Sequence, residues 1–388
     1  MARDYRRIAI AIAGFCAFLN LYSPQALLPA LAREFSVGAA QISAIMTAST
    51  FAIALTAPFT GAIADVLGRK RVITVAAVMS VVPMLIQATA TSVDALVFWR
   101  FVQGVLLPGI FAVTVAYIGD EWPPAQVAGV AGLFISGSSL GGFSGRMLPG
   151  ALADLIGWRF AFLTLAALTL ACAIAIAWLL TPEKRFVRSE GLAASARHML
   201  KHLRNPQLIA TYAVGFGVLF NFISVFTYAS FHLAAPPFNF SSTLLGAIFV
   251  TYLVGTVISP WTGWAVTRFG RRNLVIGLVG LWICGALLLL APQVAVIMLG
   301  LMVCAGCGML CQAVSTSYVT ATAKEGRSSA VGLYVTSFYI GGSAGAFFPG
   351  RAWEAWGWPA VVAIAIGMLI VMALIVALAW TRQPPKQA

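Results

Sequence analysis

Apolar residues are gathered along this chain in long stretches that short polar turns separate. Each stretch holds about 20 residues, the length of helix that crosses the hydrocarbon core of a bilayer. The pattern predicts twelve membrane-spanning helices, and neighbouring helices must be antiparallel because most connections are short. The expected spans are residues 8–31, 41–63, 72–90, 95–119, 127–151, 160–180, 207–233, 243–266, 273–291, 294–322, 328–350 and 359–380.

The composition favours a membrane protein over a water-soluble one. Hydrophobic residues make up 61% of the 388 residues and charged residues only 9%, whereas soluble domains carry about 25% charged residues. The mean hydropathy is +0.93. A globule with so few charges could not cover its surface with water-compatible groups, so we expect the chain to lie in a bilayer.

The second half of the chain repeats the pattern of the first. Residues 132–158 align with residues 332–358, and residues 61–70 align with residues 263–272, at offsets of 200 and 202. Each half holds six expected spans, and an even number gives both halves the same orientation in the membrane. The predicted fold is an all-α membrane protein with twelve transmembrane helices in two parallel six-helix bundles.

The repeat divides the chain into three expected parts. Residues 1–180 form an N-terminal six-helix bundle, residues 207–388 form a C-terminal one, and residues 181–206 form a basic cytosolic linker. The linker contains an amphipathic stretch that we expect to lie as a helix on the cytosolic membrane surface. His198 and His202, four residues apart on it, are interpreted as polar residues of a solvated face and not as metal ligands.

The basic residues are distributed unevenly between the two ends of the expected spans. The chain carries 24 Lys and Arg against 11 Asp and Glu, a net charge of +13. With the N-terminus placed in the cytosol, nineteen of the 24 Lys and Arg residues fall in cytosolic segments. This asymmetry is the positive-inside rule. We therefore expect both termini in the cytosol and no nucleic-acid partner.

Short motifs resemble those of a known family. The turn GAIADVLGRKRV at 61–72 resembles the loop between helices 2 and 3 of the major facilitator superfamily, and RFVQG at 100–104 is similar to a helix-4 motif of its proton-coupled members. Residues 134–146 and 117–124 look like the YnfM-type bacterial inner-membrane transporters, which are grouped with drug and sugar efflux carriers. One position departs from the antiporter pattern, because Ser138 stands where those members often have proline.

The turn at 61–72 places an acid and three bases at the cytosolic end of the second expected span. Arg69 is expected to bridge to Asp120 by charge-assisted hydrogen bonds, and Asp65 to lie against the positive end of a neighbouring helix. By the resemblance, Asp65, Arg69 and Asp120 form a latch that closes the cytosolic side. In the second half Thr267 replaces the acid, so we expect the latch to be lopsided.

Ionisable groups within a membrane span are functional candidates, because burying one costs several kcal/mol. Arg100 and Arg146 lie in the outer third of the fourth and fifth expected spans, and Glu34 follows the outer end of the first. In one interpretation the arginines snorkel outward or tie helix ends to acids. In the other, Arg100 tunes the proton affinity of Glu34, and Arg146 does similar work or faces an anionic group. We assign proton coupling to these three residues.

The substrate is expected to bind near the membrane midplane, between the two halves. Family architecture places helices 1, 4, 7 and 10 around the cavity, with helices 8 and 11 beside it. Hydrogen bonding between helices is the alternative role for each polar residue there. The candidates are polar and aromatic residues at mid-depth in these spans: Asn20, Tyr22, Gln25, Gln103, Phe111, Asn221, Ser224, Thr227, Tyr228, Tyr252, Gln312, Ser315 and Tyr339.

These features together predict a secondary active transporter that exports a small neutral or amphipathic solute by alternating access in exchange for protons. Export and proton coupling follow from the resemblance alone. An uncoupled carrier or an uptake symporter is the alternative, and a non-transporting membrane sensor is a more distant one.

The sequence shows no nucleotide-binding motif and no catalytic or metal-binding constellation. Cys304, Cys307 and Cys311 recur at helical spacing, and we interpret them as small packing residues and not as ligands of a soft metal. We therefore expect no enzymatic activity, no metal and no cofactor. The expected partners are the solute, protons and the lipid of a bacterial inner membrane, in which the chain is expected to be a monomer.

Overall fold

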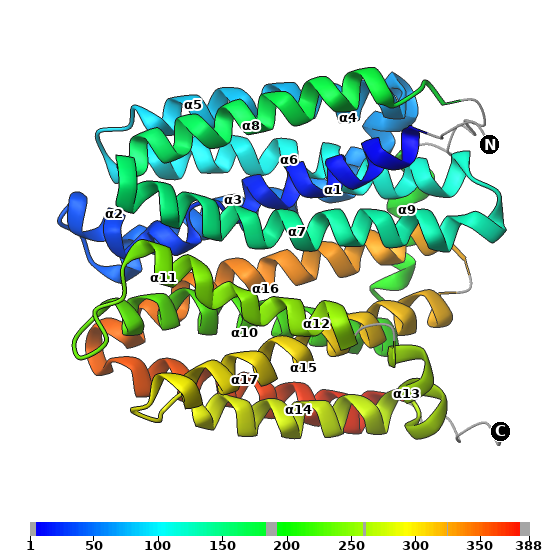
Figure 1. Ribbon diagram of the computed structural model, residues 1–388. Coiled ribbons are helices and arrows are strands. Elements are labelled where there is room, and N and C mark those ends of the chain that lie inside the picture. The colour runs from blue at the N-terminus through cyan, green and yellow to red at the C-terminus, as the bar shows by residue number, and fades with distance from the viewer. Residues whose placement is uncertain (1–4, 184–191, 259–260, 324, 381–388) are drawn as a thin grey trace. The chain divides into compact units, whose positions relative to one another are not determined.

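The computed structural model describes residues 5–183, 192–258, 261–323 and 325–380 (Figure 1). Every regular element within these ranges is a helix. Eleven helical segments of the described chain are long and apolar enough to cross a membrane, and a shorter apolar segment covers Ser242–Gly255. The prediction of an all-α membrane fold is therefore confirmed.

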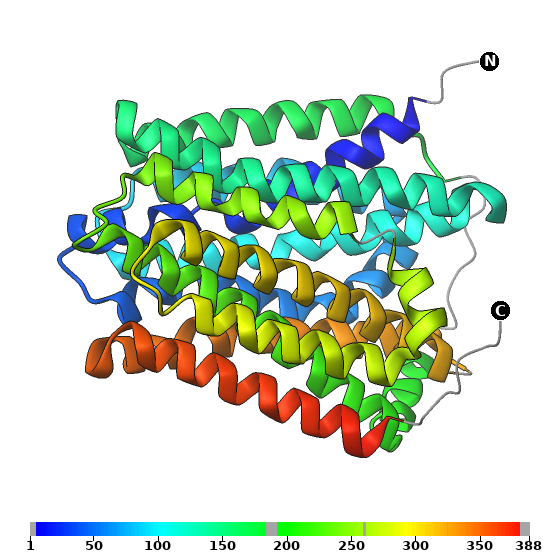
Figure 2. The ribbon, with the colours of Figure 1, turned by 60° about the horizontal axis from the view of Figure 1, so that its bottom comes forward.

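The chain divides into two compact units of helices (Figures 1 and 2). Unit 1 comprises Met1–Val37, Ala48–Leu192 and Phe240–Phe249, and unit 2 comprises Gly38–Thr47, Ala193–Asn239 and Val250–Ala388. These units follow the expected halves of the chain, except that each takes in one short segment from the other half.

The helices of the first half end where the sequence interrupts them. Pro24 has no N–H to donate, and the first expected span changes there from an α-helix to a 3-10 turn. The third expected span is interrupted at Ser80. The elements are α1 (Arg6–Tyr22), η1 (Gln25–Leu27), α2 (Leu28–Glu34), α3 (Ala39–Leu67), α4 (Arg69–Met79), α5 (Val81–Ala88), α6 (Val93–Glu121), α7 (Pro124–Ile156) and α8 (Trp158–Leu179).

The second half follows the same plan with one clear departure. The eighth expected span, 243–266, is not one continuous helix, because a 3-10 segment interrupts it. Four elements lie there: α11 (Ser242–Ala247), η2 (Ile248–Thr251), α12 (Tyr252–Ile258) and α13 (Thr262–Phe269). The others are α9 (Leu192–His202), α10 (Pro206–Ala234), α14 (Arg271–Leu288), α15 (Val294–Thr322), α16 (Arg327–Trp356) and α17 (Trp358–Ala379).

Glycines at equivalent positions make the tight turns between consecutive helices. Gly68 separates α3 from α4 with a φ of 90°, and Gly270 separates α13 from α14 with a φ of 73°. Gly157 and Gly357 do the same after α7 and α16, with φ values of 87° and 71°. A residue with a Cβ atom would be strained in this conformation, so the repeated glycines follow directly from the repeated fold.

The strongest helix pairing within each unit also repeats. In unit 1, α1 packs along α7, and in unit 2, α10 packs along α16. A Cβ atom added at Gly141 would lie only 2.7 Å from the Phe15 Cα atom, and one added at Gly341 would lie 2.7 Å from the Phe216 Cα atom. The glycine-rich stretches therefore permit close backbone packing, as the sequence pattern predicts.

Candidate functional site

An ionic cluster joins three helices of unit 1 at the end where α3 turns into α4. Arg69 lies in the first turn of α4, and its Nη1 atom is 2.6 Å from Oδ2 of Asp120, near the end of α6. Its Nη2 atom is 3.6 Å from Oδ1 of Asp65, one turn earlier in α3. The predicted bridge between Arg69 and Asp120 is therefore confirmed as a contact. The gating role remains a prediction.

The same end of unit 1 carries a further carboxylate, Glu183, which sequence reasoning missed. Oε1 of Glu183 accepts a hydrogen bond of 2.8 Å from the backbone N–H of Arg69, and Oε2 accepts one of 3.3 Å from the backbone N–H of Lys70. Glu183 thus caps the first turn of α4, where a negative charge is favourable. The available signal was the acid itself, which stands at the start of an otherwise basic linker.

In the described part of unit 2, the position equivalent to Asp65 carries no acid. Thr267 takes the place of the acid, and its hydroxyl donates to the Trp264 carbonyl of its own helix at 2.7 Å. Arg271, which the repeat aligns with Arg69, donates from Nε to the Ser317 hydroxyl at 3.4 Å. Arg272 beside it donates to the carbonyl of Ala377 at 2.7 Å. Thr267 and Arg272 therefore bond to backbone carbonyls, whereas Arg69 pairs with carboxylates.

Arg100 lies fully buried in α6, beside the break in the first span. Its guanidinium donates to the carbonyls of Asn20 and Leu21, the first at 2.8 Å. It also donates to the Ser49 hydroxyl at 3.0 Å and to Oε1 of Gln103 at 2.7 Å. In an unbroken helix the Asn20 carbonyl would accept from residue 24, but that residue is proline. Arg100 therefore supplies the donors that the end of α1 lacks.

A chain of amides extends from Arg100 through the interior of unit 1. The Gln103 amide donates to Oδ1 of Asn20 at 2.8 Å, and the Gln87 amide donates to Oε1 of Gln103 at 3.2 Å. Asn20 in turn donates to the Thr169 hydroxyl at 3.0 Å. Asn20 and Gln103 were expected to face the substrate cavity. Their contacts favour the alternative role, hydrogen bonding between helices.

Arg146 is also buried, but it lies among aromatic side chains. Its Cζ atom is 3.7 Å from the centre of the Tyr22 ring and 4.4 Å from that of the Phe249 ring. Its Nε donates to Oε1 of Gln25 at 2.8 Å. A guanidinium placed over ring faces is attracted by their negative charge. Arg146 thus joins two predicted substrate residues, Tyr22 and Gln25, in one cluster.

The expected pairing of Arg100 with Glu34 is wrong. Among the described residues, Oε1 of Glu34 pairs with the Arg159 guanidinium at 2.9 Å, and both side chains are more than 40% exposed. Arg100 instead bonds to the neutral groups named above. The reason is geometric: Glu34 ends α2, beyond the break at Pro24, whereas Arg100 bonds before it.

The predicted substrate residues fall into two groups by exposure. Most are buried: Asn20, Gln25, Gln103, Asn221, Ser224, Thr227, Tyr228, Ser315 and Tyr339. The remainder are partly exposed: Tyr22, Phe111, Tyr252 and Gln312.

Aromatic rings surround two of the partly exposed residues in unit 1. The ring of Phe18 lies 6.1 Å from those of Tyr22 and Phe111, which brings α1 and α6 together. Phe18, Tyr22 and Phe111 are partly exposed and form a surface of rings, and the buried Arg146 guanidinium lies beside Tyr22. Such a surface can stack on a planar or amphipathic solute. We call Phe18, Tyr22, Phe111 and Arg146 the aromatic cluster.

The predicted substrate residues on α10 of unit 2 are buried. Asn221 donates to the Gly217 carbonyl at 2.9 Å, and the Tyr228 hydroxyl donates to the Ala346 carbonyl at 2.6 Å. Tyr252 and Gln312 are the partly exposed members, and the Tyr252 ring lies 4.5 Å from that of Phe226. Unit 2 therefore has one partly exposed aromatic ring among these residues, that of Tyr252, which begins α12 directly after η2.

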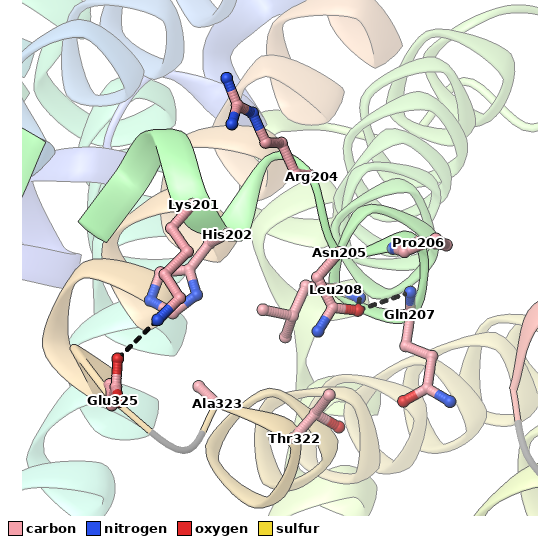
Figure 3. A pocket seen from close by; sticks show the side chains of 10 residues that line it. All are labelled: Lys201, His202, Arg204, Asn205, Pro206, Gln207, Leu208, Thr322, Ala323 and Glu325. Atoms are coloured by element: carbon pink, nitrogen blue, oxygen red, sulfur yellow. Dashed lines mark hydrogen bonds and ion pairs between the residues drawn. The ribbon is translucent and has the colours of Figure 1, made fainter. Parts of the chain in front are cut away.

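A pocket of about 780 Å³ opens elsewhere in unit 2, between α9, α10 and α15 (Figure 3). Lys201 reaches across it to Glu325 at 2.7 Å, and this hydrogen bond lowers the pKa of Glu325. Its walls are polar linker and helix-end residues, and none of the predicted substrate residues lines it. The position belongs to the linker region, so we do not assign it to the solute.

The linker helix itself is anchored to unit 2. Besides the contact of Lys201, Nε2 of His202 lies 3.1 Å from the Gly326 carbonyl oxygen. Arg197, Leu200 and Arg204 of the same segment are exposed. The expected amphipathic helix is therefore present in the described residues 192–202, with one face on the protein and apolar and basic side chains on the other.

The described residues form a repeated, all-helical arrangement with eleven segments that can cross a membrane and with no soluble domain. This arrangement defines a multi-pass membrane protein of the transporter type. The family model for the Major Facilitator Superfamily matches residues 10–236 and 219–388. The chain belongs to this superfamily of membrane transporters, as its motifs predict.

Several known proteins are similar over nearly the whole chain. It is 31% identical over 377 residues to the inner membrane transport protein YnfM of Escherichia coli (strain K12), covering 96% of this chain and 90% of that protein. It is 29% identical over 372 residues to a transporter of Buchnera aphidicola (subsp. Schizaphis graminum), covering 96% and 89%. The resemblance to the YnfM type is therefore confirmed.

Solved structures confirm the fold at low sequence identity. A mutant of the nucleoside transporter NupG has a TM-score of 0.80 at 15% identity, covering 97% of this chain and 100% of that chain. The human organic anion transporter MFSD10 has a TM-score of 0.71 at 19% identity, with coverage of 97% and 100%. Both are transporters of the same architecture, and they carry chemically different solutes.

Proposed function

We propose that the protein is a secondary active transporter that exports a small neutral or amphipathic solute in exchange for protons. Membership of the superfamily carries the transport part of this proposal. The aromatic cluster of unit 1 supports the choice of solute, because rings and amides bind planar, weakly polar molecules better than strongly hydrated ions. Export and proton exchange rest on the similarity to YnfM-type carriers.

The distribution of acids supports an uncharged solute over a cationic one. All described Asp and Glu side chains lie at helix ends or in connecting segments, whereas Arg100 and Arg146 lie within spans. A cationic solute would meet no carboxylate at mid-depth in the described helices and would be repelled by the arginines. An organic anion would meet Arg146, and this makes anions the second class to test.

The proposed proton-binding group is Glu34, now with Arg159 as its partner. A paired arginine holds a carboxylate in the charged form, and separation of the pair favours protonation. Because both side chains are partly exposed at the end of their helices, the pair can exchange protons with solution. Arg100 and Arg146 then contribute to proton coupling indirectly. Arg100 fixes the end of α1, and Arg146 fixes the rings of the aromatic cluster.

The test uses the purified full chain in proteoliposomes that contain a pH-sensitive dye. Neutral sugars, nucleosides, amphipathic drugs and organic anions are added one class at a time, and solute flux and internal pH are measured together. Opposite movement of solute and protons supports the proposal. Solute flux without a pH change would show an uncoupled carrier, and parallel movement would show a symporter. Both results contradict proton exchange.

Variants locate the solute site in the same assay. Phe111→Ala should weaken apparent solute affinity about tenfold, because a lost stacking contact contributes about 1 kcal/mol or more. Val115→Ala on the same helix is the matched control, since its side chain is 54% exposed and lies outside the cluster. Equal effects of the two substitutions would contradict the assignment of the aromatic cluster.

A further inference from the structure

The pocket between α9, α10 and α15 lies at helix ends that carry an excess of positive charge. Among the described residues of its wall, Lys201 and Arg204 stand against one acid, Glu325. Arg327 lies beside the wall, because its Nε donates to the carbonyl of Ala323 at 3.2 Å. Every described residue of the wall belongs to unit 2. By the positive-inside pattern we expect this end of the helices to face the cytosol.

The Lys201 ammonium has donors that Glu325 does not use. Its Nζ atom lies 2.7 Å from Oε2 of Glu325, and an ammonium has three N–H donors. Both side chains of this pair are more than 60% exposed, and an exposed ion pair contributes little to stability. A second anion can therefore share the Lys201 ammonium with Glu325, or take it over at small cost.

Asn205 supplies a neutral donor to the same pocket. Its Oδ1 caps α10, where it accepts from the backbone N–H groups of Gln207 and Leu208 at 3.0 and 3.4 Å. With the oxygen used in this way, the amide nitrogen is turned toward the side of the pocket formed by Thr322 and Ala323 (Figure 3). Its Nδ2 atom has no partner among the described residues, so two N–H donors are available there.

The outer face of α9 and the turn after it is apolar on one side and basic on the other. Leu200 and Leu203 are 65% and 48% exposed and lie three residues apart. Arg197 and Lys201 are also exposed and lie four residues apart. Residues at these spacings share one side of a helix. An apolar strip beside a basic strip is the surface that an interfacial helix presents to a bilayer with anionic lipids.

The apolar strip distinguishes between two sources of a phosphate group. A free phosphate compound would use the donors of Lys201 and Asn205 but would gain nothing from exposed leucines beside them. A phospholipid carries a phosphate and acyl chains together, so it can use both. The pocket volume of about 780 Å³ is in the range of small-molecule sites. A choline headgroup would bring a cation close to Arg204, so the charge of the wall favours an anionic headgroup.

We propose that this pocket binds the headgroup of an anionic phospholipid. The phosphate lies between Nζ of Lys201 and Nδ2 of Asn205, and the acyl chains pass beside Leu200 and Leu203. The bound lipid joins α9 to the start of α10 and the end of α15, and so holds the linker helix on unit 2. The amphipathic sequence alone predicts that α9 lies on a membrane, and the pocket adds one defined site that selects headgroup charge.

The test measures lipid binding to the delipidated full chain in a nonionic detergent. Phosphatidylglycerol and phosphatidylcholine with identical acyl chains are added separately, and native mass spectrometry gives the dissociation constant of each. Hydrogen exchange of residues 201–208 and 317–323 is followed at each addition, because these segments form the pocket wall. Glycerol phosphate and inorganic phosphate are the soluble probes. Phosphatidylglycerol should protect both segments, whereas the other three compounds should not.

Two substitutions should weaken the binding of phosphatidylglycerol. Lys201→Ala is expected to raise the dissociation constant about fivefold, the effect of one basic residue near an anionic lipid. Asn205→Ser keeps an oxygen that can cap α10 but loses the Nδ2 donors, and a similar fivefold loss is expected. Arg268→Ala is the matched control, because Arg268 is an exposed base in the last turn of α13 and lies outside the pocket wall. It should leave the constant unchanged.

A third substitution should act in the opposite direction. Glu325→Gln removes the carboxylate that competes for Lys201, so phosphatidylglycerol should bind about fivefold more tightly. Loss of folding cannot produce tighter binding. This variant therefore keeps the test decisive where Lys201→Ala or Asn205→Ser disturbs the structure.

Equal protection by phosphatidylglycerol and phosphatidylcholine would overturn the proposal, because headgroup charge would then have no role. Equal losses in Lys201→Ala and Arg268→Ala would overturn it too, since they would show general attraction to a basic surface. Protection by glycerol phosphate or inorganic phosphate would assign the pocket to a soluble anion and contradict the lipid. None of these measurements uses solute flux, so a failure of the proposed transport function leaves them unaffected.

Discussion

Replacement of Arg100 by alanine gives the sharpest test of how unit 1 is held together. The side chain is fully buried and donates to four groups on α1, α3 and α6. Alanine removes all of these donors at once. The carbonyls of Asn20 and Leu21 then lose the guanidinium N–H groups that donate to them. The loss falls at the end of α1, where Pro24 already lacks the backbone N–H that a continuous helix would supply.

The size of the effect follows from two limits. Hydrogen bonds within membrane proteins contribute about 0.6 kcal/mol each on average, so four of them give roughly 2 kcal/mol. Removal of one member of a buried charged network in a soluble protein costs about 3–5 kcal/mol. We therefore expect a loss of about 2–5 kcal/mol. For a unit of about 190 residues this lowers the midpoint of thermal unfolding by roughly 5–15 °C.

Thermal unfolding of the purified protein in detergent, followed by tryptophan fluorescence, measures this shift. Arg100→Lys keeps the charge but cannot form the planar fork, so an intermediate loss is expected. Lys70→Ala, a partly exposed basic residue in the first turn of α4, is the control. An Arg100→Ala protein that unfolds at the wild-type temperature yet fails to couple protons to solute would refute the structural role. It would restore the alternative in which Arg100 acts in coupling.

Three further outcomes are expected. Asp65→Asn should lower transport about fivefold with normal expression and solute affinity, because a partly buried ion pair contributes about 1 kcal/mol; normal flux would exclude a gating role. Glu183→Gln should speed hydrogen exchange in the first turn of α4 about fivefold, as expected for loss of one cap, and an unchanged rate would remove its capping role. Gly141→Val should abolish folding into detergent-stable protein, since the site lies against the Phe15 backbone; Gly61→Val, with no atom within 4 Å, should be tolerated.

Most of the fold could be predicted because the bilayer imposes simple rules. Span length follows from membrane thickness, and the repeat follows from glycines that recur where backbones must meet, as at Gly141 and Gly341. The break within 243–266 could not be predicted in this way. Hydropathy reports apolar length but not helix continuity, and η2 contains no proline or glycine to mark it.

The candidate site was only partly predictable, for a related reason. The Arg69 bridge follows from opposite charges at one end of adjacent helices, so sequence position determines it. The partners of Asn20, Arg100 and Glu34 depend instead on side-chain direction around a helix and on the break at Pro24. A shift of a single residue around the helix turns a side chain from a cavity toward a neighbouring helix. Asn20 therefore bonds to Thr169 within unit 1.

The carboxylate contacts at the two ends of the helices are distributed differently between the units. At the end where α3 turns into α4 the carboxylate cluster around Arg69 occurs in unit 1, while Thr267 occupies the place equivalent to Asp65 in unit 2. At the other end Asp154 accepts from the Thr243 N–H in unit 1, and Glu354 accepts from the Ala40 N–H in unit 2. Loss of a single residue can therefore remove the ionic contact at the first end, whereas two independent losses are needed at the second.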